Sequence, residues 1–350
     1  MDTRILAERP APRAQGGAGV ARTRVAVAGA TGFAGQELLR WMAGHPAAHV
    51  TAAMSSAPDG PPRALMALTR IWDGVVEPFS ADRLAEAADV VFLALPEEAA
   101  ATVAPALVER DVRVIDLSGA FRLRDNASRE KWYPATKLGA LTPVYGLTER
   151  DAAAIRGARL VANPGCYPTA ALLALEPLAE AGLLAGDVVI DAKSGISGAG
   201  KKATDRTHFS ENHGSVSAYG VFGHRHQPEI EQELGAAVTF VPHLVPLDRG
   251  ILETIYGRAR PGTTVQQVTD VMQAAYRTAP FVRLRGETLP EIKHVAYTNF
   301  CDIGWRVDAS GRFLMVSVID NLVKGAAGQA IQNLNVMLGL DQRSGLLPLT

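Results

Sequence analysis

The sequence predicts an α/β protein in which a Rossmann-type, doubly wound parallel sheet is followed by an α+β domain. In the first half of the chain, short valine-rich segments alternate with segments of helical pattern, as is typical of parallel βαβ units. The valine-rich segments are 24–29, 49–56, 89–95 and 112–117. After about Asn163 the pattern changes. A helix is expected at 169–181, and the β-type segments that follow indicate more antiparallel pairing.

Length and composition exclude several classes of protein. The chain has 350 residues, 47% of them hydrophobic, which suits two domains that each bury a core. Its formal net charge is −1 and its basic residues are scattered, so no nucleic-acid partner is expected. No apolar run reaches the roughly 18 residues of a membrane span, so no membrane segment is expected.

The ends of the chain and its cysteines give further expectations. Two cysteines, Cys166 and Cys301, are too few for a disulfide framework and fit a reducing, cytoplasmic location. Residues 1–20 mix arginines with acidic residues, prolines and glycines and lack the apolar core of a secretory signal, so we expect a flexible tail. The stretch 324–340 spaces its apolar residues as in a one-sided helix.

A glycine turn follows the first expected strand. Gly29, Gly32 and Gly35 separate that strand from a helical segment. Such glycines permit a tight turn, let the backbone approach a pyrophosphate and allow close packing of strand and helix, while the helix N-terminus attracts negative charge. The GxxGxxG spacing alone is equally compatible with an ordinary turn, but its place after the strand predicts a dinucleotide site.

The end of the second expected strand bears on the choice of cofactor. NAD sites usually carry an acidic residue there, which binds the ribose 2′-hydroxyl. This chain has Ser55 and Ser56 instead, with Arg63 nearby. Because hydroxyl groups accept a 2′-phosphate that a carboxylate would repel, we expect NADP(H). The alternative is that both serines merely begin a turn before Pro58.

Cys166 is the candidate nucleophile. It lies in NPGCYPTA, directly before a helical segment, where the helix dipole and free amides would lower the thiol pKa. The same amides could hold the oxyanion formed from an attacked carbonyl. The alternative for a free cysteine is a small buried side chain. Cys301, within the apolar run YTNFCDIGW, fits that alternative well, and Cys166 fits it poorly.

The segment HRHQPEI supplies candidates for the base. His226 and Glu229 lie three residues apart and would share a helical face, so Glu229 could orient the imidazole. His224 has no acidic residue at that offset, and the choice between the two histidines stays open. Either could instead be a structural hydrogen-bonding residue. A metal site is not expected, since the two cysteines are far apart and no HExxH pattern occurs.

A second glycine-rich run, Gly195 to Lys201, has the GxxxxGK core of a phosphate-binding P-loop and follows an expected strand. The next residue is Lys202, however, where Mg²⁺ binding requires Ser or Thr, and no apolar helix follows. A nucleoside-triphosphatase is therefore disfavoured. A glycine-rich loop with a lysine still suits a phosphate or carboxylate of a substrate.

Taken together, these residues resemble the long form of the N-acetyl-gamma-glutamyl-phosphate reductases, a family related to the aspartate-semialdehyde dehydrogenases. The similarity extends from about Arg24 to Leu340. It rests on seven motifs in a fixed order: GATGFAGQELLR, DLSGAFRL, NPGCYPTA, SGISGAGKKA, HRHQPEI, PHLVPLDRGI and KGAAGQAIQNLN. The segment 57–72 departs from the family pattern, which puts the adenosine-phosphate contacts in doubt.

The resemblance implies a fold similar to glyceraldehyde-3-phosphate dehydrogenase. After the 1–20 tail, an NADP-binding Rossmann domain would span 21–162 and be completed by the C-terminal helix, 324–350. A catalytic and oligomerisation domain would span 163–323. The resemblance also implies a homodimer or homotetramer that reduces a small-molecule acyl phosphate with NADPH in arginine biosynthesis.

In that mechanism, Cys166 forms a thioester and His226 is the base, with Glu229 beside it. The cofactor would contact the glycine turn, the two serines and the second glycine-rich run. These positions are Gly29, Thr31, Gly32, Phe33, Gly35, Ser55, Ser56 and Gly198. The substrate would contact Arg122, Lys201, His224 and Arg249.

Three alternatives remain. One is the related reductase of a carrier-protein-bound acyl phosphate in lysine biosynthesis, and the sequence does not distinguish it from the reductase of the free acyl phosphate. A second is aspartate-semialdehyde dehydrogenase, against which HRHQPEI and KGAAGQAIQNLN argue. The third is a regulator that binds NADP without catalysis, against which the combination of Cys166 and His226 argues.

Overall fold

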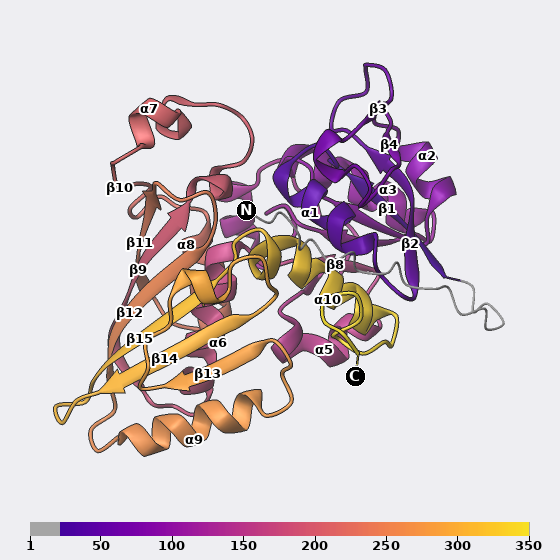
Figure 1. Cartoon of the computed structure of the whole chain (residues 1–350). Helices are drawn as coiled ribbons and strands as arrows, with labels where there is room; N and C mark the ends of the chain where they lie inside the picture. Colours follow the sequence, from indigo (N-terminus) through magenta and orange to yellow (C-terminus); the bar gives the residue numbers. More distant parts are fainter. Residues whose placement is uncertain (1–21, 350) are drawn as a thin grey trace, which may run out of the picture.

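The computed structural model describes residues 22–349, and the expected tail at 1–20 lies outside them. Figure 1 shows two lobes, one built around each of two large sheets, with the C-terminal segment returning to the first lobe. The predicted combination of a doubly wound parallel sheet and an α+β domain is confirmed.

The first sheet has six strands in the order β2-β1-β5-β6-β8-β7, all paired in parallel. The strands are β1 (Thr23–Ala28), β2 (Ala48–Met54), β5 (Val90–Leu93), β6 (Arg113–Asp116), β7 (Val144–Tyr145) and β8 (Leu160–Ala162). A small ribbon of β3 (Arg63–Ala64) and β4 (Val75–Val76) lies beyond β2. The central strands are buried on both faces, which explains their continuous apolar sequence.

Helices cover both faces of this sheet. The helices of this part of the chain are α1 (Phe33–Met42), α2 (Ala81–Ala87), α3 (Glu97–Glu109), α4 (Asn126–Trp132) and α5 (Thr148–Arg156). Apolar residues of α1 pack with Val25 and Val27 on one face, and α2 and α3 pack with Ala26 and Ala28 on the other. The chain leaves β1 toward β2 on one side and returns to β5 on the other. The carboxyl ends of β1 and β5 are thus the switch point where ligands bind in such folds.

The second sheet has seven strands in the order β10-β11-β9-β12-β15-β14-β13. They are β9 (Leu184–Gly195), β10 (Ser217–Ala218), β11 (Val238–Val245), β12 (Ile251–Ala259), β13 (Val282–Gly286), β14 (Cys301–Val307) and β15 (Arg312–Ile319). Pairing is mixed, with antiparallel pairs more numerous than parallel ones. The helices of this lobe are α6 (Cys166–Glu180), α7 (Phe209–Asn212), α8 (His226–Leu234) and α9 (Val265–Tyr276). The long helix α6 is buried along most of its length in the core of this domain.

The apolar residues of the C-terminal helix lie on one side, as predicted, but the helix has no exposed side. After a π-helical turn (Val323–Ala327), every residue of α10 (Gly328–Met337) is buried. Its apolar side joins the core around α1, as Ile331 and Leu334 show. Its polar side faces other buried polar groups: Asn333 donates to Asn163 Oδ1 (3.0 Å) and to Gly146 O (2.9 Å). Spacing alone does not distinguish a polar face in water from one that is buried and hydrogen-bonded.

Candidate active site

A cavity of about 620 Å³ lies between the two domains, at the carboxyl ends of β1 and β5. We call it the cleft cavity. The first domain contributes the glycine turn after β1 and the segments that follow β5 and β6. The second contributes the N-terminus of α6 and the loop after β9, and the C-terminal segment completes the wall with Asn321, Leu322, Gly325 and Ala326. Its volume is that of a site for a small ligand or cofactor.

The glycine turn has the geometry of a dinucleotide site. Gly29 has φ +83°, and a Cβ there would lie 2.1 Å from the Ala94 carbonyl oxygen. A Cβ on Gly35 would lie 2.2 Å from the Gly29 carbonyl oxygen, so only glycine lets strand and helix pack this closely. Gly32 caps α1 without a side-chain hydrogen bond, and the first turn of α1 holds no acidic residue. The free amides of this helix end therefore suit a pyrophosphate.

The predicted cofactor contacts lie in two places. Thr31, Phe33, Ser56 and Gly198 line the cleft cavity together with the glycine turn. Ser55 does not; it lines a neighbouring pocket of about 260 Å³ with Arg63, Asp59 and Glu77. The Ser55 hydroxyl donates to the Ala57 carbonyl oxygen (2.8 Å), as expected of a residue that begins a turn.

Cys166 is the first residue of α6, three residues earlier than the sequence predicted, and it lines the cleft cavity. Gly165 caps the helix and its carbonyl accepts a hydrogen bond from the Thr169 hydroxyl (2.9 Å). Burial raises the pKa of the Cys166 thiol to about 11, although Arg122 and the Tyr167 amide oppose this shift. This rise is opposite to the lowering expected from the helix N-terminus, because loss of solvation disfavours the charged thiolate.

His226, the first residue of α8, also lines the cleft cavity. Its Nε2 lies 3.5 Å from Arg122 Nη1, and a Cβ on Gly165 would lie 2.6 Å from the same nitrogen. Burial, together with the positive charges of Arg122 and Arg225, holds the His226 pKa well below its usual value. The imidazole is therefore neutral at neutral pH and able to accept a proton.

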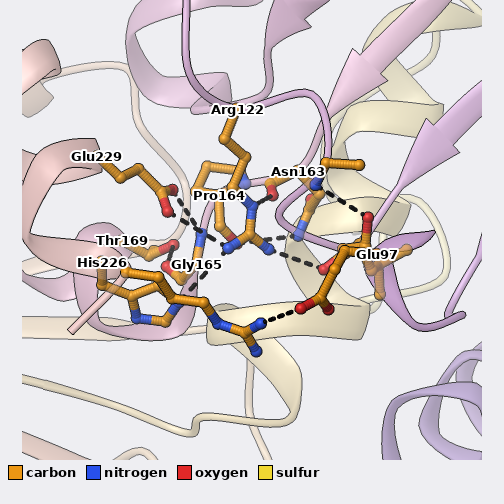
Figure 2. A network of polar contacts seen from close by, with 12 residues as sticks. Glu97, Arg122, Asn163, Pro164, Gly165, Thr169, His226 and Glu229 are labelled. Atoms are coloured by element: carbon orange, nitrogen blue, oxygen red, sulfur yellow. Dashed lines mark hydrogen bonds and ion pairs between the residues drawn. The ribbon is translucent and has the colours of Figure 1, made fainter. Parts of the chain in front are cut away.

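Glu229 does not contact His226, so the expected pairing of the two was wrong. Figure 2 shows its carboxylate directed instead at Arg122 and the turn before Cys166. Glu229 Oε1 accepts from the Gly165 amide and from the Tyr145 hydroxyl, both at 2.8 Å, and Oε2 lies 3.3 Å from Arg122 Nη1. His226 Nδ1 is buried without a hydrogen-bond partner. The offset of three residues gave the correct face, but the carboxylate reaches a cation and a helix end instead.

Arg122 connects the other groups of this network by hydrogen bonds (Figure 2). Its Nε donates to the Asn163 carbonyl (2.8 Å) and its Nη2 to the Leu117 carbonyl (2.8 Å). Those bonds leave Nη1 directed toward Glu229 and His226. Arg122 is buried and lines the cleft cavity, so its positive charge is held at a fixed place in the cavity wall.

Of the other residues expected to bind substrate, one lines the cleft cavity and two do not. Lys201 lines the cleft cavity. His224 does not: its Nδ1 accepts from the His226 amide (3.1 Å), and burial lowers its pKa to about 4. Arg249 lines an adjoining cavity and makes ion pairs with Glu37 and Asp320, both at 3.2 Å.

The sequence analysis did not identify two glycines of the site, Gly165 and Gly325. A Cβ on Gly165 would meet His226 and Arg122, and a Cβ on Gly325 would lie 2.7 Å from the Cβ of Cys166. No sequence spacing signals these contacts, because the partners are far apart in the chain. The second cysteine, Cys301, is buried with its Sγ 3.5 Å from the Ser317 hydroxyl, and burial raises its pKa to about 12.

Within residues 22–349, no group of three or more His, Cys, Asp and Glu side chains is placed to hold a metal ion. In the same range, no helix is long and apolar enough to cross a bilayer.

Comparison with known proteins shows the family to which this chain belongs. The sequence model for the NAD binding domain of semialdehyde dehydrogenases matches residues 24–158, and that for their dimerisation domain matches 166–321. The N-acetyl-gamma-glutamyl-phosphate reductase of Geobacillus sp. is 45% identical over 337 residues, which cover 92% of this chain and 98% of that protein. The chain belongs to the N-acetyl-gamma-glutamyl-phosphate reductases. The reductase from Geobacter sulfurreducens is also 45% identical, over 92% of this chain and 97% of its own.

Solved structures show that this reductase-family chain shares its fold with aspartate semialdehyde dehydrogenases. Aspartate semialdehyde dehydrogenase II from Vibrio cholerae superposes with a TM-score of 0.71 at 19% identity, over 91% of this chain and 99% of that one. The Candida albicans enzyme, determined with NADP, gives a TM-score of 0.66 at 18% identity, over 91% and 99% of the two chains. The glycine turn of this chain thus belongs to a nicotinamide-dinucleotide-binding domain.

Proposed function

We propose that this protein reduces N-acetyl-gamma-glutamyl phosphate to N-acetylglutamate 5-semialdehyde and phosphate, with NADPH, in arginine biosynthesis. The names of the relatives support the substrate. The observation that best supports this chemistry is that Cys166, a neutral His226 and Arg122 line the same cavity as the dinucleotide-binding turn.

The first step requires a thiolate from a thiol whose pKa is about 11. His226 accepts the thiol proton as the sulfur attacks the acyl carbon, so no free thiolate needs to accumulate. A carbon–sulfur bond forms, and the carbon–oxygen bond to the phosphoryl group breaks with its electron pair on the departing phosphate. The amides at the N-terminus of α6 stabilise the oxyanion, and the positive charge of Arg122 in the cavity wall favours the anionic substrate.

The product is a thioester on Cys166, which accepts a hydride more readily than a carboxylate would. When bound, NADPH supplies that hydride. The carbon–sulfur bond then breaks, the aldehyde is released, and the His226 imidazolium returns its proton to the sulfur. Glu229 is a positioning residue in this scheme: it fixes the turn before Cys166 relative to the guanidinium group of Arg122.

A phosphate-dependent assay in the reverse direction tests this function. With N-acetylglutamate semialdehyde and NADP, formation of NADPH beyond one equivalent per chain should require inorganic phosphate. Aspartate semialdehyde should be a much poorer substrate. Turnover that does not depend on phosphate, or that prefers aspartate semialdehyde, would contradict the proposal.

We also propose that the protein is cytoplasmic and forms a homodimer or homotetramer. The second domain matches a sequence model described as a dimerisation domain. It exposes large apolar side chains, Phe209 (74%), Val216 (61%) and Phe222 (75%), on the segment before α8. Sedimentation velocity at micromolar concentration should give a mass at least twice that of the chain, and a monomer would refute the assembly.

A further inference from the structure

The glycine-rich run that resembles a P-loop makes its contact across the cleft. After β9, a 3-10 turn (Ile196–Ala199) leads to Gly200, whose φ of +84° and ψ of −177° suit only glycine. This conformation directs the chain toward the first domain. The ammonium group of Lys201 then lies 3.3 Å from the carbonyl oxygen of Thr31, within the glycine turn.

An ion pair between the domains holds this loop near the turn. Arg249 Nη2 lies 3.2 Å from Glu37 Oε1 on α1, and Arg249 Nη1 lies 3.2 Å from Asp320 Oδ2. Hydrogen bonds from Asn321 Nδ2 to Ser197 Oγ (3.0 Å) and from the Ser197 amide to the Asp248 carbonyl (3.1 Å) fix the start of the loop. The approach of Lys201 to Thr31 is therefore part of a wider contact between the loop and α1.

The space beside Lys201 is favourable for an anion. The uncapped amides of α1 open into it, and the first turn of that helix carries no acidic side chain. Glu37, in the next turn, already pairs with Arg249 and Arg40. In doubly wound folds the pyrophosphate of a dinucleotide lies at this helix end. Lys201 adds a positive charge to the cavity that the first residues of α1 also line.

We propose that Lys201 binds the pyrophosphate of the dinucleotide from the second domain, so that the cofactor is held between the glycine turn and the loop at 196–202. This differs from the expectation that Lys201 binds a phosphate or carboxylate of the substrate. It accounts for the GxxxxGK pattern without a nucleoside triphosphate: the run presents a lysine to a diphosphate that the other domain binds. It depends on the dinucleotide-binding domain and not on the chemistry proposed for Cys166.

The test measures binding without turnover. Isothermal titration calorimetry with NADP and with NAD gives dissociation constants for the full-length protein and for Lys201→Ala. Loss of one hydrogen bond to a charged group should weaken binding of both nucleotides about 10-fold or more, with their ratio unchanged. Lys201→Arg should restore most of the affinity. Lys137→Ala, which removes an equal charge from an exposed site outside the cavities, is the matched control and should bind both nucleotides normally.

Each alternative has its own result. If Lys201 contacted the 2′-phosphate, Lys201→Ala would lose affinity for NADP but not for NAD. If it contacted the acyl phosphate, nucleotide binding would be unchanged and the KM for that substrate would rise. Either result, or a loss equal to that of Lys137→Ala, overturns the proposal. Because binding is measured without substrate, a failure of the proposed reaction would leave this result interpretable.

Discussion

Replacing Gly165 by Ala tests the geometry around the nucleophile most sharply. The backbone of Gly165 (φ −65°, ψ 154°) accepts alanine without strain, so any effect comes from the added methyl group. That methyl would lie 2.6 Å from His226 Nε2 and 2.9 Å from Arg122 Nη1. Ordinary contact distances are about 3.5 Å or more, so the two side chains must each move by roughly 0.5 to 1 Å. A misplacement of about 1 Å can cost about 10²-fold in rate, which is the loss of kcat/KM that we expect.

The assay is steady-state reduction of the acyl phosphate, accompanied by calorimetric binding of NADP and a thermal unfolding curve. Overpacking should cost about 1–3 kcal/mol of stability, and nucleotide binding should persist. Gly157→Ala is the matched control, since its φ is −97° and nothing lies within 4 Å of the added Cβ. Wild-type kcat/KM in Gly165→Ala would refute the placement of His226 and Arg122 as reacting groups.

The site leads to four further predictions. Cys166→Ser should lose nearly all turnover yet bind NADPH, whereas Cys301→Ser stays active; kcat and calorimetry separate the two. With Ser56 in place of an acidic residue at the cleft, kcat/KM should favour NADPH over NADH about 10- to 100-fold, and equal use would contradict this. His226→Asn should lower kcat about 10²- to 10⁴-fold, and more than His224→Asn does. Because the His226 pKa is lowered, the base is lost only as pH falls below the ordinary histidine range, so kcat/KM should stay level from pH 8 to about 6.5. A rate that falls between those values would argue for another base.

The strands and glycine turn of the first domain were predictable because local patterns determine them. Continuous valine-rich strands indicate burial on both faces, and Gly35 indicates a close backbone contact with Gly29 within one βαβ unit. Cys166 could be singled out for the same reason, since the sequence around it predicts a helix start and α6 begins at Cys166.

The electrostatics of the site were not predictable in this way. The thiol pKa depends on how deeply the second domain buries Cys166, and the partners of Glu229 come from segments more than 60 residues away. The polar face of α10 had the same difficulty, because Asn333 finds its partner 170 residues earlier in the chain. Pairwise spacing indicates which residues share a helical face but not which distant group meets that face.

The central claim is that Cys166 carries the acyl group, and trapping that intermediate tests it most directly. Supplying N-acetylglutamate semialdehyde and NADP without phosphate should let the thioester form and leave it without its acceptor. After an acid quench, mass spectrometry of the intact chain and its peptides should show one N-acetylglutamyl group on the Cys166 peptide. The group should disappear when phosphate is added before the quench and be absent from Cys166→Ser. An unmodified chain that still forms NADPH, or an acyl group on another residue, would contradict the account.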